Sequence, residues 1–317
     1  MLNVRIIDEA TVAQILTPQV LRELMRETLR ASAAGAAGGP TRAMIALPDG
    51  WFGTMPASVA LDGLEGVGAK LVTFFPRNGE RGLPTHQAMV ALFDTKTGAL
   101  RALVGGETIT ERRTAAVTAV ATQRLATRPR GVLAILGAGL QGHAHLSAFL
   151  DADLVTEFRV WSTTRAHAES LADRARALKI PVEVAADASS AVRNADVIVT
   201  VTAASEPLFP ADAVADGAHV NAVGACVPNR RELPAALVAE ANVYVDSLDA
   251  AWLESGDLLI AAQQLGRERI VVRGEIGEML ADPMRRDPPG RVTIFKSLGL
   301  GIEDVACAAF VLARLEG

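Results

Sequence analysis

The chain has 317 residues, of which 50% are hydrophobic and 21% are charged, and its formal net charge is −5. This length suggests two domains, and the acidic balance argues against nucleic-acid or anionic-membrane partners. Two cysteines cannot build a disulfide framework, no secretory pattern opens the chain, and no apolar run reaches the roughly 20 residues of a membrane span. We therefore expect a soluble cytoplasmic protein.

The N-terminal third combines a helix, a series of strands and a second helix. Apolar residues recur at helical spacing after Thr17-Pro18, which predicts a helix over Thr17–Ala33. From Ile45 to Val104 the pattern changes to short strands separated by glycine-containing turns. A second helix is expected over Glu111–Leu125, with Thr110 as its N-cap.

The rest of the chain alternates strands with helices. The predicted strands are Val132–Leu136, Phe158–Trp161, Val182–Val184, Val197–Val201, His219–Val223 and Val243–Asp246. Helices such as His167–Leu178 and Ser189–Asn194 separate them, and a last helix is expected over Ile302–Leu315. Such alternation predicts a parallel sheet with helices on both faces. The expected fold class is α/β: a Rossmann doubly wound parallel-sheet domain in the middle of the chain, plus a smaller α+β domain.

A glycine motif directly follows the first of these strands. It is Gly137-Ala138-Gly139-Leu140-Gln141-Gly142, and an apolar helix comes after it. Such glycines permit a tight turn and let the backbone approach a pyrophosphate, whose charge faces the helix N-terminus. Because strand, motif, helix and next strand follow in succession, we predict a nicotinamide dinucleotide site here.

The end of the second Rossmann strand bears on the choice of dinucleotide. After Trp161 come Ser162, Thr163, Thr164 and Arg165, where NAD-selective sites place an acidic residue for the ribose hydroxyls. Hydroxyl groups and an arginine suit a 2′-phosphate. The sequence therefore favours NADP(H) while still allowing NAD(H). The alternative is that Arg165 lies at the start of the next helix and points to solvent.

Three basic residues of the N-terminal third interrupt apolar patterns. Strand alternation places Lys70 on one face with Val72 and Phe74. Arg113, in the first turn of the predicted helix, shares a face with apolar residues, and Arg42 follows a glycine-rich loop. A buried cation needs an anion or a shifted pKa, so these residues are candidates to bind a substrate carboxylate. Ordinary salt bridges within the protein are the alternative.

The histidines indicate no metal site. His143 and His145 are two residues apart in a predicted helix and do not face one another, so we expect no bound metal. His86 opens another apolar strand within Pro84-Thr85-His86-Gln87. It is a minor candidate, since a lone histidine is more often structural.

Six stretches of the chain resemble the ornithine cyclodeaminase and mu-crystallin family. They are Lys70–Phe74, Pro84–Ala88, Ile109–Ala116, the glycine motif, Asn221–Gly224 and Phe295–Gly299. The resemblance implies a substrate-binding and dimerisation domain over residues 1–118, completed by residues 297–317, and a Rossmann domain over residues 119–296. It also implies a homodimer.

The resemblance further implies roles for single residues. Family members bind the substrate carboxylate region with an Arg, a Lys and a second Arg, which fall on Arg42, Lys70 and Arg113; of these, Lys70 and Arg113 are the expected catalytic residues. Thr85, Cys226 and Asp304 are further expected substrate contacts, although Asp304 is also favourable simply as an acidic residue in the first turn of a helix. The remaining expected cofactor contacts are Thr114, Thr202, Val223 and Lys296.

One position separates the activities within that family. Ornithine cyclodeaminases carry an Asp shortly after the Val-Gly of the fifth Rossmann strand, and Cys226 takes that position here. A thiol cannot hold the distal ammonium of ornithine as a carboxylate does. Ketimine reductases and pyrroline-2-carboxylate reductases of the family also lack this Asp and favour NADPH.

We therefore expect reduction of a small cyclic imino acid, Δ1-pyrroline-2-carboxylate or Δ1-piperideine-2-carboxylate, to the cyclic amino acid. Three alternatives stay open: an ornithine cyclodeaminase, an alanine-type amino-acid dehydrogenase, and a non-catalytic NADPH-binding protein.

Overall fold

The computed structural model describes residues 4–285 and 290–317. The expectation that no secretory pattern opens the chain falls partly on residues 1–3, which lie outside the described residues. The chain divides into two compact units. Unit 1 comprises Met1–Arg113 and Gly299–Gly317, and unit 2 comprises Thr114–Leu298. The domain boundaries expected from the sequence and the roles assigned to the two domains stay predictions.

Unit 1 is a sheet covered on one face by helices. Its strands are β1 (Arg5–Ile7), β2 (Ala37–Gly38), β3 (Ala43–Leu47), β4 (Gly50–Leu61), β5 (Leu64–Phe74), β6 (His86–Phe93) and β7 (Leu100–Gly105). Within the described part of the chain they pair in the order β1-β7-β6-β5-β4-β2, with β3 also on β4. The helical elements are α1 (Glu9–Ile15), α2 (Pro18–Ala33), the 3-10 turn η1 (Pro76–Arg81), the start of α3 (Glu107–Leu125) and α11 (Gly301–Glu316).

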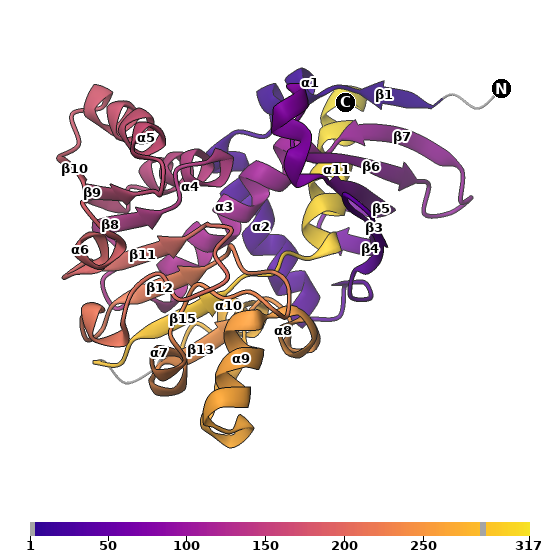
Figure 1. Ribbon diagram of the computed structural model, residues 1–317. Helices are drawn as coiled ribbons and strands as arrows, with labels where there is room; N and C mark the ends of the chain where they lie inside the picture. Colours follow the sequence, from indigo (N-terminus) through magenta and orange to yellow (C-terminus); the bar gives the residue numbers. More distant parts are fainter. Residues whose placement is uncertain (1–3, 286–289) are drawn as a thin grey trace. The chain divides into compact units, whose positions relative to one another are not determined.

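The C-terminal helix α11 is the central packing element of unit 1. It lies against β4, β5, β6 and α2 (Figure 1, yellow helix). A Cβ added at Gly66 of β5 would meet Ala309 and Val305 of α11, so the glycine allows close approach of helix and strand. The face of β5 that carries Gly66 and Lys70 is therefore the face covered by α11.

The expectation of short strands is wrong for β4 and β5, which run for 12 and 11 residues. They form one long antiparallel hairpin around the turn Asp62-Gly63, where Gly63 has a φ of 73°. The helix predicted over Thr17–Ala33 is confirmed, with the Thr17 side chain accepting the Val20 N–H as N-cap.

The helix α3 begins earlier than predicted, at Glu107 rather than after Thr110. The reason is a cap from a distant residue. The Glu9 carboxylate accepts the backbone N–H groups of Glu107 (2.9 Å) and Thr108 (2.8 Å), which would otherwise lack partners at the helix start. Arg113 consequently lies in the second turn of α3, and the expectation that it occupies the first turn is wrong.

Unit 2 is a Rossmann fold. Its strands are β8 (Gly131–Leu136), β9 (Val155–Trp161), β10 (Val182–Val184), β11 (Val197–Thr200), β12 (His219–Ala222), β13 (Asn242–Val245), β14 (Val272–Glu275) and β15 (Thr293–Lys296). Its helical elements after α3 are α4 (Leu140–Asp151), α5 (Arg165–Ala177), α6 (Ala188–Val192), η2 (Ala211–Ala213), α7 (Ala235–Glu240), α8 (Leu248–Glu254), α9 (Gly256–Leu265), η3 (Arg267–Arg269) and α10 (Ile276–Ala281).

The strands of unit 2 are all parallel where the structure describes them, in the order β10-β9-β8-β11-β12-β15-β13-β14. The strand order reverses between β8 and β11, the place where such folds bind ligands. Leu133 and Ile135 of β8 belong to one buried apolar cluster, and Ala134 and Leu136 belong to another. This confirms a sheet with both faces covered. The sequence missed β14 and β15, because Lys296 ends β15 with a charge and each strand has only four residues.

Candidate active site

Two buried cations of unit 1 share their counter-ions on α11. The Lys70 ammonium lies 2.8 Å from Asp304 Oδ2, and Arg113 Nε donates to Asp304 Oδ1 at 3.2 Å. Arg113 Nη1 also donates to the Glu303 carboxylate. All four side chains are almost completely buried. Strand β5, helix α3 and the first turn of α11 therefore hold one compact ionic cluster, which we call the Lys70–Arg113 cluster.

Burial and charge act in opposite directions on the two cations. Burial lowers the pKa of Lys70 to about 8, although Asp304 opposes the shift. For Arg113, burial also disfavours the charge, but the carboxylates of Asp304 and Glu303 outweigh it and raise the pKa. Arg113 is thus permanently charged, whereas Lys70 exchanges its proton near neutral pH.

Arg42 joins the same region from the residue before β3. Its guanidinium Nη2 donates to the carbonyl oxygen of Gly299 at 3.4 Å. A Cβ at Gly299 would lie 2.5 Å from Arg113 Nη1, and Gly299 has a φ of 81°, so glycine is required beside the guanidinium. Arg42, Lys70 and Arg113 therefore bring three cations to the start of α11, beside the carboxylates of Asp304 and Glu303.

The structure changes the interpretation of the basic residues. The burial of Lys70 and Arg113 is confirmed, whereas Arg42 is half-buried. Protein carboxylates already remove much of the cost of burying Lys70 and Arg113, so burial alone does not require a substrate anion. Asp304 is a counter-ion to both cations as well as a first-turn helix acid. Sequence reasoning missed Glu303, although a second acid beside Asp304 on the buried face of an apolar helix was a usable signal.

Thr85 and His86, two further candidate site residues, lie at the start of β6 in unit 1. Thr85 is exposed, and its carbonyl oxygen accepts the Phe75 N–H at 2.8 Å. His86 is exposed, and its ring also packs against Trp51 and Phe74. Burial, and then the charges of Lys70, Arg113 and Arg42, lower its pKa to about 4. His86 is therefore neutral at physiological pH, with an imidazole nitrogen able to accept a hydrogen bond.

The glycine motif of unit 2 has the geometry that a pyrophosphate needs. Gly137 has a φ of 106°, and a Cβ there would lie 2.6 Å from the Val201 carbonyl oxygen. A Cβ at Gly142 would collide with the carbonyl oxygen of Gly137, so this glycine permits close packing of α4. Gly139 faces open space and caps α4 with no side-chain hydrogen bond. Tight turn, open approach and close packing are the three glycine roles of a dinucleotide site.

Ala138 and Gln141 of the motif are less open. Ala138 is buried, and the Gln141 carbonyl oxygen lies 2.7 Å from His145 Nδ1. Helix α4 is therefore anchored on its inner side, while its N-terminus keeps its backbone N–H groups for a phosphate.

Strand β9 ends at Trp161, as the sequence predicted. Ser162 is half-buried, and Thr163 and Arg165 are exposed. The Arg165 guanidinium lies 3.1 Å from Glu169 in an exposed pair one turn along α5. Exposed pairs of this kind are weak, so Arg165 keeps its freedom to bind another anion.

A buried carboxylate organises the loops after β11 and β12. Glu232 accepts hydrogen bonds from Thr200 Oγ1 (2.8 Å), from the N–H (2.6 Å) and hydroxyl (2.8 Å) of Thr202, and from the Gly224 N–H (2.8 Å). Val223, directly before Gly224, is buried. Both loops leave the carboxyl edge of the sheet, where dinucleotides bind. Glu232 lies far along the chain from the glycine motif and was missed from the sequence.

Lys296 and Cys226 lie at the same edge of the sheet. The Lys296 ammonium is completely buried and lies 3.1 Å from Asp257 Oδ2. Burial disfavours its charge, but Asp257, Cys226 and Glu232 outweigh this and raise the pKa of Lys296. The Cys226 thiol donates to the Val223 carbonyl oxygen at 3.1 Å. Thr114, the first residue of unit 2, is buried in α3.

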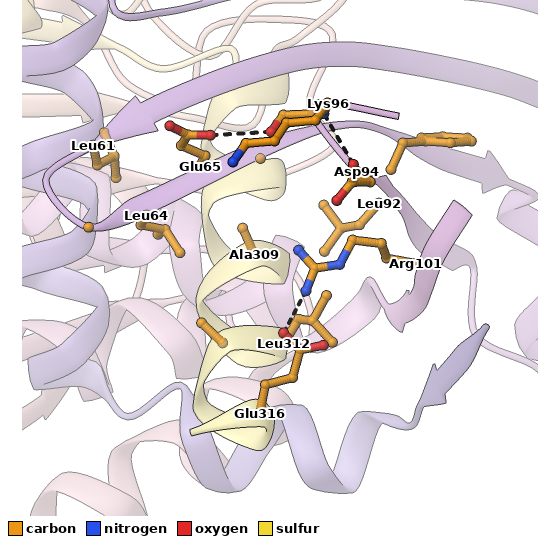
Figure 2. Close-up of a pocket in the computed structure, with 15 residues that line it drawn as sticks. Leu61, Leu64, Glu65, Leu92, Asp94, Lys96, Arg101, Ala309, Leu312 and Glu316 are labelled. Atoms are coloured by element: carbon orange, nitrogen blue, oxygen red, sulfur yellow. Dashed lines mark hydrogen bonds and ion pairs between the residues drawn. The ribbon is translucent and has the colours of Figure 1, made fainter. Parts of the chain in front are cut away.

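A pocket of about 520 Å³ in unit 1 lies away from the Lys70–Arg113 cluster. Figure 2 shows Arg101 paired with Glu316, at 2.5 Å, and Glu65 accepting a hydrogen bond from the Thr95 hydroxyl at 3.2 Å. None of the predicted substrate-binding residues lines this pocket, so we do not take it as the active site. Among residues 4–285 and 290–317, no helix is long and apolar enough to cross a membrane, and no three potential metal ligands cluster.

The parallel sheet and the glycine loop define a dinucleotide-binding protein of the Rossmann class. A sequence profile of the ornithine cyclodeaminase/mu-crystallin family matches residues 4–317, and the chain belongs to this family. The recognition made from the six sequence stretches is thereby confirmed, as is the fold class.

Three relatives indicate the kind of chemistry. The ketimine reductase mu-crystallin of Mus musculus is 42% identical over 83% of this chain and 80% of its own length. A Δ(1)-pyrroline-2-carboxylate reductase of Bacillus cereus is 34% identical over 80% and 78%. The iminosuccinate reductase of Paracoccus denitrificans is 32% identical over 98% and 97%.

Two solved structures share the whole fold. The Δ(1)-pyrroline-2-carboxylate reductase of Thermococcus litoralis, bound to NADH and L-proline, matches with a TM-score of 0.92 at 28% identity, over 99% of this chain and 98% of that one. An archaeal alanine dehydrogenase dimer with bound NAD matches with 0.91 at 29% identity, over 99% and 96%. The chain is an oxidoreductase, and its cofactor is a nicotinamide dinucleotide.

Proposed function

We propose that this protein reduces a small cyclic imino acid, Δ1-pyrroline-2-carboxylate or Δ1-piperideine-2-carboxylate, to the cyclic amino acid. The observation that carries the proposal is the convergence of three cations, Arg42, Lys70 and Arg113, at the start of α11. Such a group of donors suits the binding of one substrate carboxylate. Relatives named ketimine reductase and Δ(1)-pyrroline-2-carboxylate reductase support the same choice.

The residues of unit 1 would bind and orient the substrate. Arg42 and Lys70 would hold the carboxylate, while Arg113, fixed by Asp304 and Glu303, supports the positive field around it. When bound, the reduced nicotinamide supplies the hydride that adds to the imine carbon. The imine nitrogen gains a proton, and Lys70, with a pKa of about 8, is suited to provide it near neutral pH.

The glycine loop would hold the pyrophosphate, and the end of β9 would bind the adenosine ribose. Because no acidic residue follows Trp161, and Ser162, Thr163 and Arg165 offer donors, we propose that NADPH is preferred over NADH. The similar structures hold NADH or NAD. The relatives therefore support a nicotinamide cofactor, while the preference for NADPH rests on the residues after Trp161.

A cyclodeaminase activity is disfavoured by one residue. The Cys226 thiol donates to the backbone carbonyl oxygen of Val223, and a thiol cannot hold a distal ammonium as a carboxylate does. We further propose a homodimer, in line with the dimeric alanine dehydrogenase of the same fold. Both cysteines are free thiols, in accord with a reducing compartment, and we propose the cytoplasm as its location.

A substrate panel tests the proposed function. Purified protein would be assayed for loss of NADPH or NADH absorbance with the two cyclic imino acids, with pyruvate plus ammonia, and for proline formation from ornithine with NAD. The expected result is oxidation of NADPH with a cyclic imino acid at a kcat/KM at least about tenfold above every other pair. Proline formation from ornithine, or turnover with pyruvate and ammonia alone, would replace this proposal with the corresponding alternative.

A further inference from the structure

Three aromatic side chains form a row across the sheet of unit 1. Strand register places Trp51 of β4 opposite Phe74 of β5, and Phe74 opposite His86 of β6. The ring centroids of Trp51 and Phe74 are 5.8 Å apart, those of Phe74 and His86 5.2 Å, and those of Trp51 and His86 5.9 Å. Each ring therefore contacts the other two, Trp51 and His86 edge to face, and the three form one compact aromatic cluster, which we call the aromatic wall.

The aromatic wall shares a sheet face with Lys70. Residues 70, 72 and 74 of β5 point to the same face, and their partners in register point there too. Between the wall and Lys70, the middle row is Gly53, Val72 and Ala88, of which two are small. A Cβ at Gly53 would approach the Trp51 ring to 3.2 Å, so the absent side chain leaves room for the indole.

The wall is only partly covered. Trp51 and Phe74 are half-buried and His86 is exposed, so part of the ring surface remains available to a ligand. Strand register places His86 opposite Phe74, on the same face of the sheet as Lys70. The acidic residues named in this region are Asp304 and Glu303 of α11. Both are already bonded to cations.

We propose that Trp51, Phe74 and His86 bind the part of the substrate that is not its carboxylate, and that they select a ring without a charged side group. This inference rests on the proposed function, because it assigns a carboxylate to the cations. A flat ring gains contact area on the aromatic faces, and its nitrogen, once protonated, can donate a hydrogen bond to the neutral His86 imidazole. A second carboxylate would meet the neutral wall, which offers it no cation. A distal ammonium would face the cations Arg42, Lys70 and Arg113.

The wall therefore determines specificity within the family. Iminosuccinate, the substrate named for the Paracoccus relative, carries two carboxylates, and this chain is expected to discriminate against it. Trp51 is the main specificity residue, because the indole presents the largest flat surface of the three.

The first test measures binding rather than turnover. Calorimetric titration of the NADP-loaded protein with pyrrole-2-carboxylate, a planar ring with one carboxylate, is compared with titration by succinate. We expect the ring to bind at least tenfold tighter than the diacid, and Trp51→Leu to weaken ring binding about tenfold, which corresponds to the loss of one aromatic contact and its area. Phe310→Leu is the matched control in α11, where Phe310 packs against Arg314, and it should bind as the wild type does.

The second test reverses the specificity. Trp51→Arg adds a cation to the wall and should raise the kcat/KM for oxaloacetate plus ammonia, relative to that for Δ1-piperideine-2-carboxylate, by at least tenfold. His86→Phe keeps an aromatic ring but removes the acceptor, and should raise KM more than it lowers kcat. An unchanged substrate ratio in a folded Trp51→Arg protein, or wild-type ring binding in Trp51→Leu, would overturn the assignment.

These outcomes separate the two proposals. If the wild type binds pyrrole-2-carboxylate through Trp51 but reduces no cyclic imino acid, the wall is correct and the reaction is wrong. If it reduces cyclic imino acids while Trp51→Leu leaves both binding and KM unchanged, the reaction is correct and the wall is wrong. Thermal unfolding of each variant verifies the fold, and Trp51→Phe replaces Trp51→Leu if the latter is unfolded.

Discussion

At the scale of single residues, the Lys70–Arg113 cluster combines a structural and a chemical role. Asp304 bonds both cations, and Glu303 bonds Arg113. Removing one member would leave a buried charge without its partner, which typically costs about 3–5 kcal/mol. A loss of activity on replacing Arg113 therefore measures stability and substrate binding together. Lys70 is the better probe, because its own proton can be titrated.

We predict that kcat/KM falls above pH 8 because Lys70 then loses the charge that binds the substrate carboxylate. Its pKa is lowered to about 8, so the ammonium form dominates below that pH. The measurement is a pH profile of kcat/KM from pH 6 to pH 10. In Lys70→Arg, which has lower activity but a permanent cation, the fall should disappear.

The pH dependence of stability provides the control for this profile. The folded pKa of Lys70 lies below the ordinary value of 10.5, so between about pH 8 and pH 10.5 the unfolded chain binds more protons. Considered alone, Lys70 then makes unfolding less favourable as the pH rises through this window. Unfolding through Lys70 therefore cannot explain the fall in kcat/KM. A profile that is flat to pH 10 would contradict the role of Lys70.

At the scale of elements, the loop between β8 and α4 is both a structural turn and a binding surface. Gly142 allows α4 to pack against the turn, whereas Gly139 faces open space. Substitution of Gly142 should therefore affect stability, and substitution of Gly139 should affect cofactor binding. The start of helix α3 likewise has a structural cause outside the helix, because it is capped by the carboxylate of Glu9 in α1 rather than by its own sequence.

We predict that Gly142→Ala lowers the free energy of unfolding by about 1–3 kcal/mol, because the methyl group collides with the Gly137 carbonyl oxygen. Gly139→Ala should change stability by less than about 1 kcal/mol but weaken NADPH binding at least about tenfold, since the methyl group occupies the approach of the pyrophosphate. Urea unfolding without cofactor and a fluorescence titration with NADPH measure the two effects. Wild-type NADPH affinity in Gly139→Ala would show that the pyrophosphate lies elsewhere.

At the scale of the whole molecule, the face of the unit 1 sheet opposite α11 is unusually apolar. Leu71 of β5 and Met89 of β6 are paired in register there, and their exposed fractions are 38% and 36%. Phe93 and Ile45 are also exposed, at 39% and 62%. A monomer rarely exposes so many large apolar side chains on one sheet, so this face is the one we expect in the proposed homodimer.

We predict that the wild type elutes as a dimer in size-exclusion chromatography with light scattering, and that Leu71→Glu raises the dimer dissociation constant about thirtyfold or more. The reason is that a carboxylate at a buried interface loses its hydration without gaining a partner. Leu178→Glu, at an exposed leucine following α5 in unit 2, is the control and should remain dimeric. A monomeric wild type, or a fully dimeric Leu71→Glu, would exclude this face as the interface.

The sequence by itself determined the features that depend on neighbouring residues. The apolar strand β8, the glycine motif and the helix after it lie within one short segment, so the Rossmann fold and its cofactor class were evident. Strand alternation likewise predicted that Lys70 is buried, because that pattern is local. The match of six stretches to one family then indicated the class of enzyme.

Only the tertiary structure decided which distant groups meet. Asp304 and Glu303 reach Lys70 and Arg113 from the last helix of the chain, and Glu232 links two loops of the Rossmann sheet. The row of Trp51, Phe74 and His86 likewise exists only because β4, β5 and β6 pair in one register. Such contacts are set by the packing of whole elements, which local pattern does not specify. The charge balance and the proposed specificity of the site therefore followed from the fold.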